Sequence, residues 1–568
     1  MVQNELKKAV IGALGNLKIE APEIVLEHPA DLSHGDFSTN VALACAKKVG
    51  KNPRELAELI IKEISQRQLK EIESISVAGP GFINFKLSAK FLGEEMAKIV
   101  EDGNFGRNQS LKGKKVIVEY TDPNPFKQFH IGHLMSNSIG ESIARLFEYT
   151  GAEVKRANYQ GDVGLHVAKA IWGMEHKAKE LAEAKSNNPS EQVAFLGSCY
   201  AFGAKDDSEK AKKEIQDLNK KVYERSDEKI NQLFDWGRKA SLDYFETIYH
   251  KLGTKFDFYF FESEVGPIGK QVVEEFLPHG VFEKSDGAVI FKGEDHGLHT
   301  RVFLNKEGLP TYEAKELGLS KVKHDKYSYD ISVVVTGNEI KEYFKVLLCA
   351  MSLVFPELAR KTKHLSHGML RLPTGKMSSR TGDVITGESL LLGVESMVHE
   401  KIAERELVTE EKNRIANEVS VGAIKYSILR QAIGGDIIFD LEKSISFEGD
   451  SGPYLQYSYA RAQSVLRKAK LQGPALYDKA GPCNEVGVLE RHLIRFPEVV
   501  ERAQQEFSPH HIATYLIEIA GAFNSFYANT KIIGSGEGEY YRLVLVRAFS
   551  QVMKNGLYLL GIKSPEVM

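Results

Sequence analysis

The chain has 568 residues, which is too long for a single hydrophobic core and predicts roughly two to four domains. Its 74 lysines and arginines nearly balance its 77 aspartates and glutamates, which argues against a general polyanion-binding protein but allows a local basic face. Four widely spaced cysteines without a CxxC pair predict free thiols and no metal site. No apolar run approaches about 18 residues and no signal-peptide pattern begins the chain, so we expect a cytoplasmic protein without a membrane partner.

The first section, residues 1–110, alternates between helical and strand-like patterns. The runs LKKAVIGALGNL and NPRELAELIIKEISQ place apolar residues at helical period. The run SISVAGPGFINFKLS predicts two short strands around a Gly-Pro-Gly turn. This section is therefore expected to be a small α+β domain.

The middle section, residues 111–390, contains strand-like runs separated by helical stretches, which predicts a parallel α/β sheet. These runs are KKVIVEY, AEVKRANY, GAVIF and ISVVVTG. A charged and mostly helical stretch at roughly residues 175–250 is expected to be an insertion, and a solvated helical face explains its charge. From residue 391 to 568 strand patterns vanish and the periodicity is helical, which predicts an α-helical bundle.

Two histidines stand where the first strand of the predicted sheet gives way to a helix. The turn-forming residues 122–125 follow the strand, and apolar residues recur at helical period from Ile131. His130 and His133 therefore lie at a helix N-terminus, where backbone N–H groups and the helix dipole favour an anion such as phosphate. Gly132 between them lets a flat ring approach the backbone. The spacing alone is equally compatible with two histidines in an ordinary loop.

A second motif, TGKMSSRTGD at residues 374–383, favours the phosphate-binding interpretation of the two histidines over the ordinary loop. Lys376, Ser378 and Arg380 crowd a glycine-rich loop that can close over a triphosphate, although a polar surface loop is the alternative. HIGH followed by KMSS in a chain of this organisation resembles the class I aminoacyl-tRNA synthetases, whose signatures are HIGH and KMSKS. Ser379 stands where that pattern has its second lysine.

Further motifs, in the same order along the chain, resemble those of arginyl-tRNA synthetases. They are YTDPNPFKQFHIGHL, NYQGDVG, LPTYEAKELG, KMSSRTGD, GPYLQYSYARAQSVLRKA and LLGIKSPEVM, with HPADLSHGDFSTNVALACAK and GPGFINF before them. The resemblance implies an N-terminal additional domain (1–110) near the outer corner of the tRNA. It also implies a Rossmann-like class I catalytic domain with its insertion (111–390) and a helical anticodon-binding domain (391–568).

The implied activity is that of an arginine–tRNA ligase, usually a monomer. Such an enzyme activates L-arginine with ATP and Mg²⁺ to arginyl-adenylate and transfers it to the 3′-terminal adenosine of tRNA(Arg). The resemblance assigns catalysis and ATP binding to His130, Gly132, His133, Lys376, Met377 and Ser378. Lys127, three residues before His130, is a candidate for the phosphate charge that Ser379 cannot supply; a solvated lysine is the alternative.

The residues matched to the arginine pocket are Glu119, Asn124, Tyr312 and Glu316. A guanidinium has five donors and no acceptor, so carboxylates and neutral acceptors suit it. Tyr312 and Glu316 are four residues apart on one helical face, and Glu316 replaces the family's usual aspartate. Without the resemblance, a solvated glutamate on an amphipathic helix would be the preferred interpretation.

The resemblance also assigns tRNA contacts, because aromatic faces and a guanidinium suit unstacked bases. In the bundle these are Tyr454, Tyr457, Arg461, Phe526, Tyr527 and Met568, and near the D-loop they are Phe82 and Asn84. Core packing is the alternative for the tyrosines and for Phe82. Other functions remain open at this point: another class I synthetase-like enzyme, a nucleotidylyltransferase that would not need the bundle, or a catalytically silent tRNA-binding paralogue.

Overall fold

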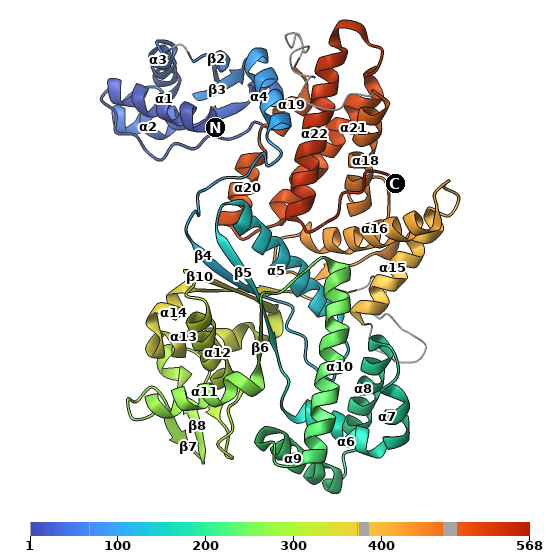
Figure 1. Ribbon diagram of the computed structural model, residues 1–568. Helices are drawn as coiled ribbons and strands as arrows, with labels where there is room; N and C mark the ends of the chain where they lie inside the picture. Colours follow the sequence, from blue (N-terminus) through green and yellow to red (C-terminus); the bar gives the residue numbers. More distant parts are fainter. Residues whose placement is uncertain (1, 68, 372, 374–385, 470–485) are drawn as a thin grey trace.

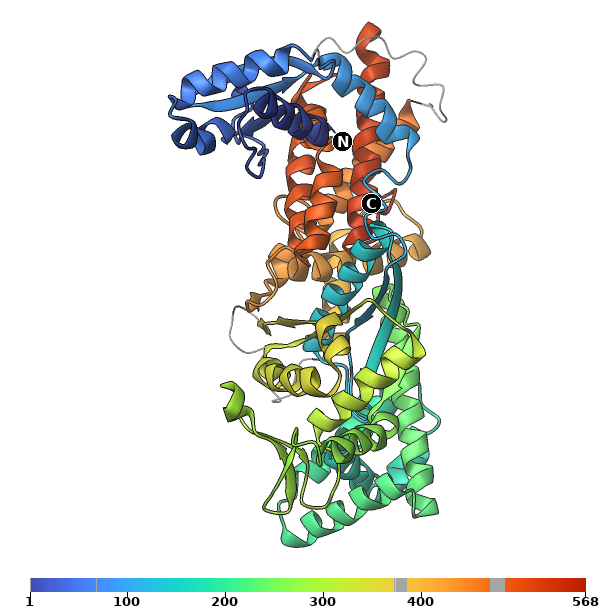
Figure 2. The ribbon, with the colours of Figure 1, turned by 90° about the vertical axis from the view of Figure 1, so that its left-hand side faces the viewer.

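The computed structural model describes all residues except 1, 68, 372, 374–385 and 470–485. The molecule is elongated, with a parallel sheet in its middle (Figures 1 and 2). The N-terminal α+β domain lies beside the C-terminal helical bundle at one end, and the helical insertion forms the other end. The predicted mixed α/β class, with a parallel-sheet domain followed by a helical bundle, is confirmed.

The N-terminal domain packs helices against an antiparallel sheet of order β1-β3-β2. The apolar stripe predicted for the second helical run is buried, with Leu56, Ile60 and Ile64 inaccessible to solvent. The short strand β1 was not predicted, because three residues carry no visible alternation. The elements are α1 (Val2–Asn16), β1 (Phe37–Thr39), α2 (Val41–Val49), α3 (Pro53–Ser65), β2 (Ile72–Ala78), β3 (Phe82–Leu87) and α4 (Ala89–Glu101).

The catalytic sheet has the order β11-β10-β4-β5-β6, and all of its strand pairs are parallel. Alternate residues of the central strand β4 enter two different cores: Val116 and Val118 pack with α5, and Ile117 packs with α12 and α13. A strand buried on both faces explains the continuous apolar run in the sequence. The strands are β4 (Lys115–Glu119), β5 (Glu153–Gln160), β6 (Phe258–Phe261), β10 (Ile331–Gly337) and β11 (Thr362–His367).

Helices cover both faces of this sheet, and the predicted insertion is present between β5 and β6 with a core of its own. The helices flanking the sheet are α5 (Ile131–Tyr149), α11 (Glu262–Phe276), α12 (Tyr312–Lys326), α13 (Lys341–Val354) and α14 (Pro356–Lys361). The insertion comprises α6 (Leu165–His176), α7 (Ala178–Ala184), α8 (Pro189–Lys205), α9 (Glu209–Glu224) and α10 (Glu228–Leu252).

One strand prediction is wrong in its placement. GAVIF forms β8 (Ala288–Phe291) in a separate antiparallel sheet with β7 (Glu283–Ser285) and β9 (Arg301–Leu304). Only Asp286 and Gly287 separate β7 from β8, and both have positive φ (48° and 83°). A two-residue Asp-Gly turn of this kind joins antiparallel neighbours, whereas a parallel pair needs a long crossover.

The C-terminal section is helical as predicted, with one exception. The short strand β13 (Ile437–Ile438) pairs in parallel with β12 (Leu370–Arg371), so the expectation that strands end before residue 391 is wrong there. Two residues are too few for a periodic signal. The helices are α15 (Gly387–Lys401), α16 (Thr409–Leu429), α17 (Leu441–Ser444), α18 (Gly452–Lys468), α19 (Val488–Leu493), α20 (Phe496–Gln505), α21 (His510–Asn529) and α22 (Glu539–Leu559).

A buried ion pair fastens the N-terminal domain to the bundle. Asp36, in the HGDF motif, pairs with Arg491 of α19, and the two residues are only 2% and 9% exposed. The other carboxylate oxygen of Asp36 accepts the Leu87 N–H at 2.7 Å. His28 Nε2 contacts Glu498 Oε2 at 2.8 Å beside this pair. The position of the N-terminal domain therefore depends on charges that lie far away in the sequence.

Arg491→Ala is expected to lower the free energy of unfolding by about 3–5 kcal/mol, because it leaves the buried Asp36 carboxylate without its cation. Thermal unfolding and limited proteolysis of the full chain measure this loss. Adding Asp36→Asn to the variant should recover part of it. The exposed Lys8–Glu5 pair is the control, and Lys8→Ala should change stability by less than about 1 kcal/mol. Equal effects of Arg491→Ala and Lys8→Ala would contradict the role of this ion pair.

Candidate active site

The turn that follows β4 is held in a strained conformation. Thr121, Asp122 and Phe126 have positive φ values of 83°, 48° and 67°, which non-glycine residues rarely adopt. The Thr121 N–H donates to Ser136 Oγ at 2.8 Å, and the Phe126 N–H donates to Ser241 Oγ at 2.9 Å. Such strain persists where surrounding contacts fix the backbone, as they do here. The turn therefore presents its side chains in one geometry at the carboxyl end of the central strand.

The two histidines of the HIGH motif stack at the start of α5. Their ring centroids are 3.5 Å apart, and the His130 N–H donates to His133 Nδ1 at 3.1 Å. The neutral His133 ring consequently carries its proton on Nε2, where it can be donated to a ligand. Burial, and then the neighbouring ring of His130, lower the pKa of His133 well below its usual range. Burial also lowers the pKa of His130. The pair therefore offers neutral hydrogen-bond donors at a helix N-terminus.

The second motif lies outside the described residues, so Lys376, Met377 and Ser378 have no structural placement. The residues that follow this motif in the sequence lie next to the histidines. Thr386 pairs with His130 in an isolated antiparallel bridge, and the Gly387 N–H donates to the Phe129 carbonyl at 2.6 Å. Thr386 and Gly387 therefore lie beside the HIGH turn.

Lys127 lies next to the histidine pair and also contacts the insertion. Its ammonium is 4.7 Å from the centre of the Tyr200 ring on α8, a cation–π contact. Its positive charge contributes to the lowered pKa values of both His130 and His133.

The two predicted arginine-binding carboxylates, Glu119 and Glu316, interact electrostatically, and Asp122, which was not predicted, interacts with both. Glu119 ends β4, is 1% exposed and accepts a 2.7 Å ion-pair contact from Lys323 of α12. Burial and the charge of Glu119 raise the pKa of Glu316 to about 8. The same two causes raise the pKa of Asp122, whose Oδ1 accepts the Tyr159 N–H at 2.8 Å. Three carboxyl groups therefore share one ammonium in this cluster.

Tyr312 and Asn124 occupy the surroundings of the acidic cluster. Tyr312 begins α12 and is 65% exposed, so its ring is free to contact a ligand. Lys315, which pairs with Glu262 at 2.5 Å, lies 5.4 Å from the centre of the Tyr312 ring. A side chain at Gly161 would collide with the amide oxygen of Asn124, so the glycine leaves room for it.

Several neighbours of the site were missed by the sequence analysis. Lys323 lies seven residues after Glu316, two turns along the same helical face, and this spacing was visible. His367, at the end of β11, contributes to the lowered pKa values of both HIGH histidines. Tyr200 of the insertion contacts Lys127. No local sequence pattern indicates that His367 or Tyr200 lies near the site.

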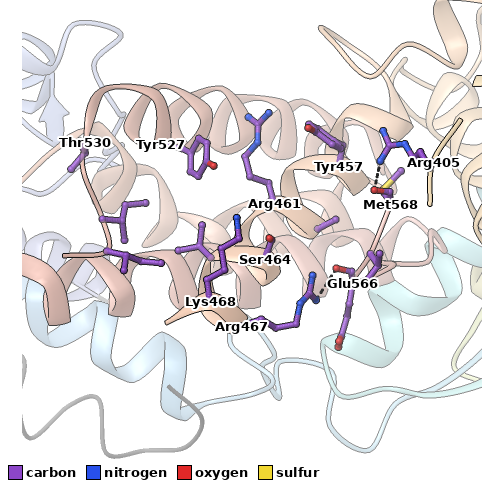
Figure 3. A pocket seen from close by; sticks show the side chains of 15 residues that line it. Arg405, Tyr457, Arg461, Ser464, Arg467, Lys468, Tyr527, Thr530, Glu566 and Met568 are labelled. Carbon is purple, nitrogen blue, oxygen red and sulfur yellow. Dashed lines mark hydrogen bonds between the residues drawn. The ribbon is translucent and has the colours of Figure 1, made fainter. Parts of the chain in front are cut away.

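The helical bundle contains a hollow of about 630 Å³ that brings four predicted tRNA-binding residues together: Tyr457, Arg461, Tyr527 and Met568 (Figure 3). The Arg461 guanidinium lies between two rings, 4.8 Å from the centre of Tyr457 and 5.0 Å from that of Tyr527. Arg405, Arg467 and Lys468 add positive charge that the sequence analysis did not include. Cations and exposed aromatic rings are the chemistry that suits single-stranded nucleic acid.

The other predicted tRNA contacts are placed differently. Tyr454 and Phe526 are half-buried, pack against the bundle core and do not line the hollow. Asn84 is 6% exposed and accepts a 2.7 Å hydrogen bond from Ser38 of β1, so it links two strands of the sheet. Phe82, at the start of β3, is 36% exposed.

No helix in the described ranges is long and apolar enough to cross a membrane. Within the same ranges, no group of three or more histidine, cysteine, aspartate and glutamate side chains could hold a metal ion.

A HIGH turn at the carboxyl end of the first parallel strand, followed by an insertion and a helical bundle, defines a class I aminoacyl-tRNA synthetase. Three family models match in the corresponding order. The class I catalytic domain for arginine matches residues 95–441, the DALR anticodon-binding domain matches 455–568, and the arginyl-tRNA synthetase N-terminal domain matches 1–87. The chain belongs to the arginyl-tRNA synthetase family, as its motifs predicted.

Individual relatives agree over the full length. An arginine–tRNA ligase of Clostridium acetobutylicum is 31% identical, with 98% of each chain covered. One of Fusobacterium nucleatum is 32% identical, covering 98% of this chain and 97% of the relative. The structure of Thermus thermophilus arginyl-tRNA synthetase is similar in fold, with a TM-score of 0.83 at 24% identity and all of both chains covered.

Proposed function

We propose that this chain is an arginine–tRNA ligase that uses ATP to activate L-arginine and then transfers it to tRNA(Arg). The observation that carries this proposal is the combination of the stacked His130–His133 pair with the acidic cluster of Glu119, Asp122 and Glu316 on one edge of the sheet. The histidine pair suits phosphates, and the acidic cluster suits a guanidinium. Charging of total tRNA with labelled arginine tests it. Charging with a different amino acid, or with none, would contradict the proposal.

Activation requires the arginine carboxylate to attack the α-phosphate of ATP, so that pyrophosphate leaves and arginyl-adenylate forms. No protein nucleophile is needed, because the enzyme contributes positioning and stabilisation of charge on the phosphates. His133 would donate from Nε2, the start of α5 would face the nucleotide, and Lys127 and Lys376 would supply positive charge. Mg²⁺ enters as part of the nucleotide complex. The ribose hydroxyl of the terminal adenosine then attacks the adenylate carbonyl.

Recognition of arginine would rest on the acidic cluster. Burial, and then the charge of Glu119, raise the pKa values of both Glu316 and Asp122, although the charge of Lys323 lowers them. A guanidinium would supply the missing positive charge and pair with a carboxylate through two hydrogen bonds. Tyr312 is exposed at the edge of this cluster and would cover the bound side chain.

Recognition of tRNA would be divided between two domains. The hollow of Tyr457, Arg461, Tyr527 and Met568 would receive anticodon-loop bases, and Phe82 would meet the D-loop from the N-terminal domain. The Asp36–Arg491 pair would fix the spacing of these two surfaces. The monomeric state and the cytoplasmic location remain predictions.

Replacing Tyr457 and Arg461 together by alanine should raise the KM for tRNA by about 10–100-fold, since each base–aromatic stack is worth about 1–3 kcal/mol. Aminoacylation at varied tRNA concentration measures the effect, and a thermal melt reports whether the bundle stays folded. Arg414→Ala is a matched control, because Arg414 is an exposed cation of α16 paired with Glu418. If the melting temperature and charging fell in parallel, the two residues would be structural.

A further inference from the structure

The acidic cluster carries more negative charge than its surroundings balance. Glu119 has Lys323 as its ion-pair partner at 2.7 Å, with both side chains at most 3% exposed. No ion pair among the described residues joins Asp122 or Glu316 to a cation. The nearby ammonium of Lys315 is engaged by Glu262 at 2.5 Å. Two carboxyl groups therefore face a shielded site without a cation of their own.

The elements packed around Glu316 add further acidic groups. From β4 it faces Glu119, from α11 Glu262, and from α12 both Glu313 and the cation Lys323. The Tyr159 and Tyr343 hydroxyls, from β5 and α13, lie close enough for the charge of Glu316 to raise their pKa values. Asp122 lies on the turn after β4, and the charge of Glu316 contributes to its raised pKa. Lys323 opposes this effect and lowers the pKa of Glu316, but its ammonium is already paired with Glu119.

We propose that L-arginine binds by exchange with a proton: Glu316 is a neutral carboxylic acid in the free enzyme and releases its proton to solvent when the guanidinium arrives. The exchange balances, because a carboxylic acid and a guanidinium cation give a carboxylate–guanidinium pair and one free proton. The inference rests on the proposed function, since it names arginine as the ligand. It adds that, without arginine, a proton on Glu316 removes one negative charge from the pocket. Arginine must displace this proton to bind.

The electrostatic surroundings support the exchange. Burial and then Glu119 raise the pKa of Glu316 to about 8, so the free enzyme at pH 7 holds the proton. A bound guanidinium at hydrogen-bond distance would favour the ionised form. Because the bound state then carries one proton fewer, arginine affinity must rise with pH while Glu316 is still protonated in the free enzyme. Between pH 6 and 7.5 the Kd for arginine is expected to fall about tenfold per pH unit.

Titration calorimetry of the full chain with L-arginine measures the released proton directly. At pH 7 the binding heat should differ between phosphate and Tris buffers by the difference in their ionisation enthalpies, corresponding to about one proton per arginine. A binding heat that is the same in both buffers would overturn the inference, while the proposed function would stand because arginine still bound. If arginine failed to bind with ATP and tRNA present, the proposed function itself would fail.

Two variants assign the proton to one side chain. Glu316→Gln should bind arginine more weakly, with heat that does not depend on the buffer and a Kd that is flat between pH 6 and 7.5. Glu313→Gln is the matched control, because Glu313 lies on the same helix, is 6% exposed and already has Arg301 within 3.8 Å. It should release about one proton, as the parent does. Proton release that persisted in Glu316→Gln would overturn the assignment.

Discussion

Lys127→Ala is expected to slow arginyl-adenylate formation by about 10²-fold, as for the loss of one preorganised contact to the transition state. Lys127 lies beside the HIGH histidines, where its charge is felt by both rings. The affinity for arginine should change little, because a contact made mainly in the transition state affects kcat more than ground-state binding. Pre-steady-state ATP–pyrophosphate exchange with tRNA present measures the rate.

The competing source of phosphate charge is Arg380, which lies outside the described residues. If Ser379 leaves the second motif one lysine short and Lys127 compensates, Ser379→Lys in the Lys127→Ala background should recover part of the rate. Should Lys127→Ala exchange as fast as the parent while Arg380→Ala fails, the compensating charge belongs to residues 374–385. The contact between Lys127 and the Tyr200 ring would then be structural.

Glu316→Gln is expected to raise the KM for arginine by one to two orders of magnitude at pH 8 and above. The lost charge-assisted contact is worth roughly 1.5–3 kcal/mol. At pH 7 the increase should be smaller, because the parent must first release a proton from a group whose pKa is raised to about 8, which costs about 1.4 kcal/mol. Steady-state kinetics at the two pH values measure both effects.

Glu313→Gln again supplies the comparison, since its carboxylate already lies near Arg301. It should leave the KM for arginine within about threefold of the parent at both pH values. An unchanged KM in Glu316→Gln would remove Glu316 from the pocket. The acidic site would then rest on Asp122 and on the Glu119–Lys323 pair.

The elements that the sequence predicted well are those whose own residues carry a strong periodic signal. The strand ending at Glu119 is apolar on both faces, and the helix from Ile131 repeats its apolar positions over five turns, so each was visible locally. The strands β6 and β11 were missed, because β6 has four residues and β11 includes Lys363 and two histidines. GAVIF was assigned to the wrong sheet, since alternation does not report which strand is the partner.

The sequence by itself determined the family, the order of the domains' characteristic motifs and the residue types at both ligand sites. HIGH at a strand–helix junction and the arginine-matched Tyr312 and Glu316 needed no coordinates to be recognised. Such signals are local, because each depends on neighbours within one or two turns of chain. They do not state which charges meet across the fold.

Only the tertiary structure decided the electrostatic state of the pocket. Glu119 and Lys323 are 204 residues apart, yet they form a 2.7 Å ion pair. The raised pKa of Glu316 follows from burial and from Glu119, and neither is encoded near position 316. The same holds for Asp36 and Arg491, which fix the N-terminal domain on the bundle. The interaction energy between two charges depends on the distance between them in the folded chain and on how far burial removes them from solvent. It is therefore set only when the whole chain has folded.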